Sequence, residues 1–195
     1  DGSSVKANRK TRSGWNLWHP KDFEVEYSEL LSRVMMAMEG NLTKDWRAFV
    51  GTVPLVTIAP LVRGFGDERI VDDPRPGKQG RTFRYYADYT YYPLTDEAAK
   101  DLGKTMSFRD ALFIDKAIME FNAIILRLLE KANADLAARK KKGRFFLVDT
   151  SNALTDMAWK RNSGMPTYVF PEELKWMYPP LDTKYYTTTD KGEIA

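Results

Sequence analysis

Cysteine is absent from the 195 residues, and histidine occurs once, as His19. Without cysteine the chain can form neither a disulfide framework nor a thiolate metal site. Proline, aspartate or arginine interrupts every apolar run before it reaches the roughly 18 residues that a membrane span requires. We therefore predict no membrane span and no metal site built on thiolates.

The chain also has little excess charge, with a formal net charge of +3. A nucleic-acid binder usually carries a dense basic face, so this balance predicts no nucleic-acid partner. The densest cationic cluster lies at residues 139–144, at the end of a predicted helix. Cations there complement the negative end of the helix dipole, and we interpret them that way.

Cofactor motifs are missing as well. Gly64, Phe65 and Gly66 form a Gly-x-Gly that lacks the third glycine and the following helix of a phosphate-binding turn. Asp72 and Asp73 lack the alternating ligands of a calcium loop. We predict no cofactor.

Hydrophobic residues make up 43% of the chain, which is ordinary for a globular protein, and their spacing predicts helices and strands. Apolar residues three and four apart predict a helix at 20–38 and a long one from Ser107 to Lys142, capped by Ser107 and ended by Gly143. Short apolar runs predict strands at 47–53 and 144–149, and a helix follows at 151–161.

Other stretches lack such periodicity. Residues 1–14 are small and polar and predict a flexible terminus, and 162–195 predict an irregular tail. Residues 64–82 have the composition of a long surface excursion. The tyrosine-rich run 81–96 fits either a strand pair or an irregular lid, so 64–104 is interpreted as an insertion.

These elements predict an α/β fold in a single domain that spans 1–195. Both strands are nearly continuously apolar, which is typical of a parallel sheet buried on both faces. Two strands alone do not make a stable sheet. The predicted helices therefore need more sheet than the chain obviously supplies.

Candidate catalytic residues have structural alternatives. His19 lies in "NLWHP", but Asn16 stands where a hydrolase triad needs a carboxylate, so we interpret His19 as part of a helix entry. Thr150 or Ser151 follows a strand and is equally placed to cap the next helix, which is the commoner role. Asp149 is interpreted as a cap of the same helix.

Several stretches together resemble the middle of an SGNH/GDSL-type hydrolase, from about residue 15 to 162. They are "NLWHPKDFEVEYSELLSRV", "FVGTVPLVTIAPLVRG", "RYYADYTYYPLTD", "SFRDALFIDKAIMEFNAIILRLLE" and "FFLVDTSNALTDMAWKRN". The matching features are Phe23 and Tyr27 on a helix, Phe121, Asn122 and Ile125 on a later helix, and a strand that ends at Val148, Asp149 and Thr150.

The resemblance implies a partial three-layer, flavodoxin-like α/β/α domain with a parallel sheet and the tyrosine-rich insertion. Neither the family's Gly-Asp-Ser block nor its Asp-x-x-His block can be assigned in this sequence. The resemblance therefore implies a central fragment of a serine ester hydrolase, inactive alone, with a small-molecule ester as substrate of the complete enzyme and no catalytic residue in this chain.

The substrate-pocket residues that follow from this view lie on the segment after the first strand and on the tyrosine-rich run. They are Thr52, Pro54, Thr57, Tyr89 and Tyr91. The alternative is a non-catalytic α/β domain that binds carbohydrate or peptide through its tyrosine-rich surface.

Overall fold

The computed structural model describes residues 17–41, 45–59, 61–91, 94–158, 160–162 and 172. The predicted flexible terminus at 1–14 and nearly all of the predicted tail at 162–195 lie outside these residues. The elements are helices α1 (Pro20–Asn41), α2 (Asp96–Asp101), α3 (Phe108–Ala138) and α4 (Thr150–Met157), a 3-10 turn η2 (Val56–Ile58), and strands β1 (Arg47–Gly51), β2 (Val62–Asp72), β3 (Thr82–Tyr91), β4 (Met106–Ser107) and β5 (Arg144–Val148). This mixture confirms the α/β class.

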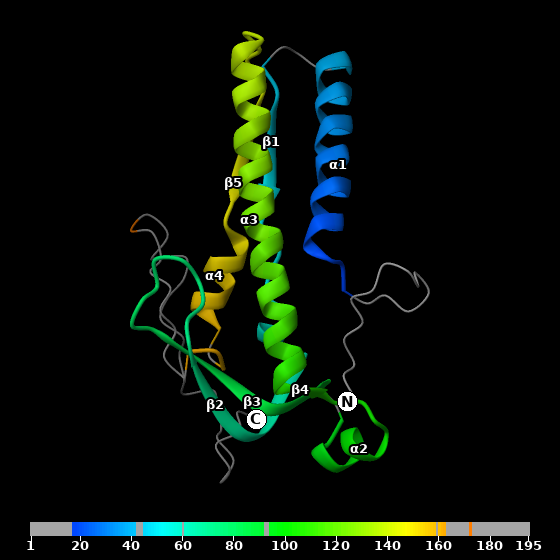
Figure 1. The fold of residues 1–195 in the computed structure, drawn as a ribbon, viewed down its shortest axis with the longest axis vertical. Helices are drawn as coiled ribbons and strands as arrows, with labels where there is room; N and C mark the ends of the chain where they lie inside the picture. Colours follow the sequence, from blue (N-terminus) through cyan, green and yellow to red (C-terminus); the bar gives the residue numbers. More distant parts are fainter. Residues whose placement is uncertain are drawn as a thin grey trace.

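The two long helices α1 and α3 lie side by side, as the apolar periodicity predicts (Figure 1). Ser107 caps α3, because its hydroxyl oxygen accepts a hydrogen bond from the Asp110 amide at 3.3 Å. The rings of Phe23 on α1 and Phe121 on α3 stack with centroids 4.4 Å apart. The apolar stripe of α3 thus buries itself against α1 on one side and the parallel strands on another.

The predicted end of the long helix at Gly143 is wrong. α3 ends at Ala138, and Lys140 has a φ of 54°, in the left-handed region that commonly terminates helices. Gly143 is needed for another reason. A Cβ at this position would overlap the indole ring of Trp46, which packs edge-on against the Phe145 ring at 5.2 Å.

Strands β1 and β5 pair in parallel, with Phe49 opposite Phe146. Together they form a two-stranded sheet, which confirms for the described residues that the chain supplies little parallel sheet. The expectation of burial on both faces is wrong. One face packs Ala48, Val50 and Phe145 against the helices, but on the other face Phe49 is 71% exposed.

The predicted surface excursion at 64–82 is also wrong in its first half, because β2 runs through it and pairs antiparallel with β3. The sequence of β2 is mostly polar and charged, so no apolar alternation marks it as a strand. The tyrosine-rich run contributes a strand, β3, and its partner is the segment before it. A register shift between Phe65 and Glu68 interrupts the ladder.

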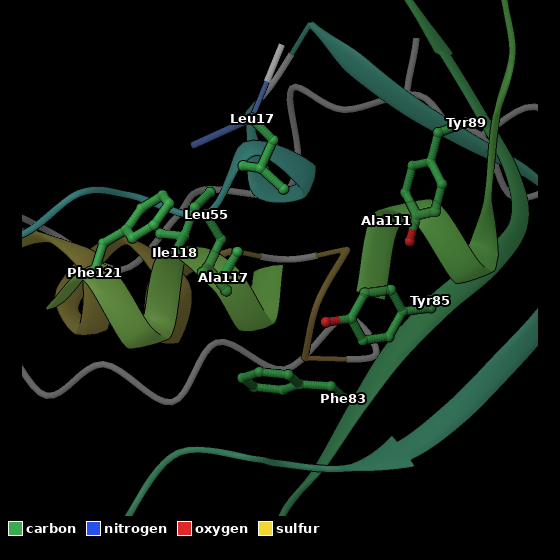
Figure 2. Close-up of a cluster of buried hydrophobic side chains, with 9 residues drawn as sticks. All are labelled: Leu17, Leu55, Phe83, Tyr85, Tyr89, Ala111, Ala117, Ile118 and Phe121. Atoms are coloured by element: carbon green, nitrogen blue, oxygen red, sulfur yellow. The ribbon is translucent and has the colours of Figure 1, made fainter. Parts of the chain in front are cut away.

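The hairpin of β2 and β3 lies at one end of the long helices, where it packs on the first part of α3 (Figure 1). Figure 2 shows the aromatic side chains of β3 facing the helix and the chain after β1. The fully buried members of this core include Phe83, Tyr85 and Tyr89, together with Leu55 and Ala111. The hairpin is therefore a packed part of the described structure.

The last helix is shorter than predicted, since α4 covers Thr150–Met157 and ends before residue 161. No helix in the described ranges is long and apolar enough to cross a membrane.

The buried stripe of α3 predicts where substitutions destabilise the protein. Ile125 is 1% exposed, whereas its neighbour Leu126 is 43% exposed. We expect Ile125→Ala to lower the free energy of unfolding by about 2–5 kcal/mol because it leaves a cavity in the core. The matched control Leu126→Ala should cost less than about 1 kcal/mol. Urea unfolding followed by circular dichroism measures both, and equal losses would contradict this packing.

Candidate functional site

Polar side chains gather where the two parallel strands end. Because β1 and β5 run the same way, the residues after them meet at one edge of the sheet. The Thr52 hydroxyl donates to Asp149 Oδ1 at 3.1 Å and accepts from the Ser151 amide at 2.8 Å. The Thr150 hydroxyl in turn donates to the carbonyl oxygen of Thr52. These contacts fix the chain direction after β1.

Asp149 confirms its predicted role as the cap of the following helix. Its Oδ1 accepts from the Asn152 amide at 3.2 Å, and its Oδ2 accepts from the Asn152 side chain at 2.7 Å. The alternative that Thr150 or Ser151 is the N-cap is wrong, because both lie in the first turn of α4.

Asn122 holds the next residue after β1. Its side-chain oxygen accepts from the Val53 amide at 2.7 Å, and its side-chain nitrogen donates to the Val53 carbonyl at 2.9 Å. An amide side chain thus takes the place of a neighbouring strand, and it holds the backbone of Val53 as the chain leaves the sheet.

A buried ion pair lies further along the same segment. Arg161 is 1% exposed and Asp115 is fully buried, and Arg161 Nη2 lies 3.1 Å from Asp115 Oδ2. The same carboxylate oxygen accepts from the hydroxyls of Thr57 at 2.5 Å and Tyr85 at 2.8 Å. Arg161 also lies over the Tyr85 ring, 3.8 Å from its centroid, and its Nη1 donates to the Arg84 carbonyl at 2.9 Å.

We name these four residues, Thr57, Tyr85, Asp115 and Arg161, the Arg161 cluster. Burial raises the pKa of Asp115, and the charge of Arg161 and the two donated hydroxyls oppose that rise. Burial also raises the pKa of the Tyr85 hydroxyl far above its usual range, so Tyr85 stays a donor at neutral pH. Oδ1 of Asp115 and Nε of Arg161 have no hydrogen-bond partner among the described residues.

Lys160 adds a second anchor beside this cluster. Its Nζ donates to the Ala59 carbonyl at 2.5 Å and also to the Val62 carbonyl. Burial, together with the nearby charge of Arg161, lowers the pKa of Lys160 to about 8. The segment after α4 therefore holds both ends of the connection between η2 and β2.

A third group of charges connects the hairpin turn to α4. Arg75 donates to Asp73 Oδ2 at 2.8 Å, to Asp156 Oδ1 at 2.7 Å and to Asn152 Oδ1 at 3.0 Å. Burial raises the pKa of Asp156, but the hydrogen bond and charge of Arg75, with Lys78 and Arg81, outweigh it and hold the pKa below its usual range. Through Asn152 and Asp149 this group continues to Thr52.

The predicted pocket residues fall into different surroundings. Thr52 belongs to the strand-end contacts, whereas Thr57 and Tyr89 are buried next to Arg161. Pro54 is exposed on the segment between them, and Tyr91 is 63% exposed at the end of β3. The structure thus brings Thr57 and Tyr89 together, separates Thr52 from them, and leaves Pro54 and Tyr91 accessible.

His19 lies at the entry of α1. Its Nδ1 accepts from the Lys21 amide at 3.3 Å, and its carbonyl accepts from the amides of Asp22 and Phe23. These are contacts of a helix start, as the sequence predicts. Within the described ranges, histidine, aspartate and glutamate form no group that could hold a metal ion.

Asp115 and Arg161 were missed by reasoning from the sequence. The signal in the sequence was the position of Asp115, four residues after Ala111 and three before Ile118, on the buried stripe of α3. A carboxylate at such a position needs a partner. The identity of that partner was hidden, because Arg161 lies 46 residues away in a turn.

Comparisons with known proteins gave no relative: no family model, no curated protein and no solved structure matches the chain.

The Arg161 cluster predicts strong coupling between its two charges. We expect Asp115→Asn or Arg161→Met alone to cost about 3–5 kcal/mol of unfolding free energy, because each leaves a buried charge or donor unpaired. The double variant should lose clearly less than the sum of the two. Urea unfolding of the wild type, the two single variants and the double variant gives the free energies of this double-mutant cycle. Arg33→Met, which breaks the exposed pair with Glu29 on α1, is the control and should cost about 0.5 kcal/mol or less. Additive losses in the cycle would contradict the coupling.

The depressed pKa of Asp156 predicts acid sensitivity. A carboxyl with a lower pKa in the folded state adds stability above its unfolded pKa, and that stability is lost as the pH falls through the folded pKa. Asp156→Asn should therefore cost about 1–3 kcal/mol at pH 7, and the cost should shrink as the pH falls below about 4. The exposed Asp67 supplies the control Asp67→Asn. A cost of Asp156→Asn that stays constant down to the acid limit of folding would refute the assignment.

Proposed function

We propose that this chain is the central part of a serine acyl-ester hydrolase of the SGNH/GDSL type and supplies its scaffold and one wall of the substrate pocket. The observation that carries the proposal is the fixed path of residues 52–59 at the carboxyl end of β1. In open α/β sheets, ligands bind outside the carboxyl ends of the strands. A segment anchored at that edge is suited to form a pocket wall.

The side chains of this wall divide into anchors and accessible groups. Thr52, Leu55 and Thr57 point into the protein and hold the backbone. Val53, Pro54 and Val56 remain exposed between them. Small apolar side chains on a rigid backbone favour contact with the acyl chain or the alcohol of an ester, since pockets are lined mainly by apolar groups with few polar ones.

In the proposed reaction, a serine outside this chain attacks the ester carbonyl while a histidine base takes the serine proton. The alcohol then leaves with that proton, and water hydrolyses the acyl-enzyme to release the acid. Amide donors hold the oxyanion of each tetrahedral intermediate. The role of this chain is to orient the ester. The complete domain would be a three-layer, flavodoxin-like α/β/α fold, of which β1, α3 and β5 form one unit.

The alternative of a carbohydrate- or peptide-binding domain has less support. Tyr85 and Tyr89 are buried, and the Tyr89 hydroxyl accepts from the Tyr86 amide at 3.1 Å. Tyr91 is exposed and Tyr86 is half-buried, which leaves a small aromatic surface for stacking on a sugar.

Ester hydrolysis tests the proposal. We expect residues 1–195 alone to turn over no p-nitrophenyl butyrate, and the polypeptide from the complete reading frame to hydrolyse it. A fluorophosphonate probe should label a serine outside these residues, located by mass spectrometry. His19→Ala in the complete polypeptide should keep kcat/KM within about twofold, because His19 serves the helix start. A labelled serine within 1–195, or loss of turnover with His19→Ala, would overturn the proposal.

A further inference from the structure

The outer edge of β1 has free hydrogen-bonding groups. Arg144 donates its amide to the Trp46 carbonyl, and the Thr52 amide donates to the Val148 carbonyl. In a parallel ladder the residues that bond to the neighbour alternate with residues that face away. The amides and carbonyls of Arg47, Phe49 and Gly51 therefore point away from β5, and no described residue pairs with them.

Side chains of α3 occupy the neighbouring edge positions. Asn122 bonds to both backbone groups of Val53, just after β1. Asn133 does the same for Phe145, which lies on the outer edge of β5: it accepts from the Phe145 amide and donates to the carbonyl, each at 2.9 Å. The two asparagines close the start of the β5 edge and the end of the β1 edge. On β1 the open stretch is residues 47–51, and on β5 the alternation leaves the single residue Leu147 facing outward as well.

The helix layer is wider than the sheet beneath it. α1 packs on α3, and α3 packs on β5. Two packed helices cover about 20 Å, which is the width of about four strands at 4.8 Å spacing. The described sheet has two strands. Figure 1 shows α3 between β5 and α1, so the uncovered width lies under α1, on the side of β1.

We propose that the outer edge of β1 binds an apolar β-strand from a part of the protein outside these 195 residues, and that this strand fills the space beneath α1. The inference rests on the proposed function, in which the nucleophile also comes from that part. The added strand bonds to Arg47, Phe49 and Gly51. The exposed rings of Phe49 and Phe146, stacked with centroids 5.5 Å apart, lie on the sheet face that a further layer would cover.

A second copy of the chain fits this edge poorly. Pairing β1 with β1 in one continuous sheet, with the helices on one face, places two copies of α1 over the same strands. The face itself offers two strands of five residues each, far less than the roughly 800 Å² per partner of a standard interface. A single added strand, in contrast, needs only the free backbone groups along the outer edge of β1.

Amide hydrogen exchange of residues 1–195 and of the polypeptide from the complete reading frame tests the proposal. In 1–195 we expect the Phe49 and Gly51 amides to exchange at least about 100-fold faster than those of Ala48 and Val50, which bond to β5. In the complete polypeptide the Phe49 and Gly51 amides should become as slow as their neighbours. This readout does not depend on esterase activity. Protection of the amides without ester turnover would refute only the proposed function. Turnover without protection would refute only the proposal that a strand binds to the edge of β1.

A proline pair supplies the matched variants. Phe49→Pro removes an amide that faces away from β5, so 1–195 should keep its circular dichroism spectrum, and the complete polypeptide should lose the protection at Gly51. Val50→Pro removes an amide that bonds to β5 and should disrupt the sheet in both. Protection of Phe49 in 1–195 itself would overturn the proposal, whether it depends on concentration, as for a second copy, or disappears on removal of 163–195. A reading frame that encodes no further residues would also overturn it.

Discussion

The ion pair of Asp115 and Arg161 joins four separate parts of the chain. Asp115 comes from α3, Thr57 from the segment after β1, Tyr85 from the hairpin and Arg161 from the turn after α4. Burying two charges is costly, and their attraction offsets that cost only where further donors complete the site. Here two hydroxyls and an aromatic face offset part of the cost, while Asp115 Oδ1 and Arg161 Nε have no hydrogen-bond partner among the described residues. The pair consequently permits one arrangement of these four segments and penalises the others.

This constraint explains why the loop after β1 is rigid although it lacks regular structure beyond η2. Its start is fixed by Thr52 and Asn122, its middle by Thr57 and its end by the contacts of Lys160. The partners of these anchors lie on α3 and on either side of α4, so the loop keeps its path only in the folded protein. If this loop forms the proposed pocket wall, that wall is preorganised, which reduces the ordering cost when a ligand binds.

The predictable part of the fold was the part with local signals. The apolar period of α1 and α3 and the Ser107 cap sufficed to place both helices, and the apolar runs sufficed for β1 and β5. β2 was not predicted because its charged sequence has no apolar alternation. Its strand conformation depends instead on pairing with β3. The end of α3 escaped because Lys140 adopts a conformation usual for glycine. The partner of Asp115 was not predicted because a contact between segments far apart in the sequence produces no local pattern of residues.

The open edge of β1 and the anchored loop after it are adjacent, and an asparagine side chain of α3 determines where one ends and the other begins. Asparagines on α3 satisfy the strand edge where no neighbour is needed, at Val53 and Phe145, and leave residues 47–51 available. An exposed edge beside an exposed Phe49 promotes aggregation, so a stable protein covers or pairs it. A strand added there would extend the sheet under α1, and its carboxyl end, if parallel, would lie beside Thr52 and Val53. The same addition that completes the core would then bring new side chains to the edge where the loop that we propose as a pocket wall is already fixed.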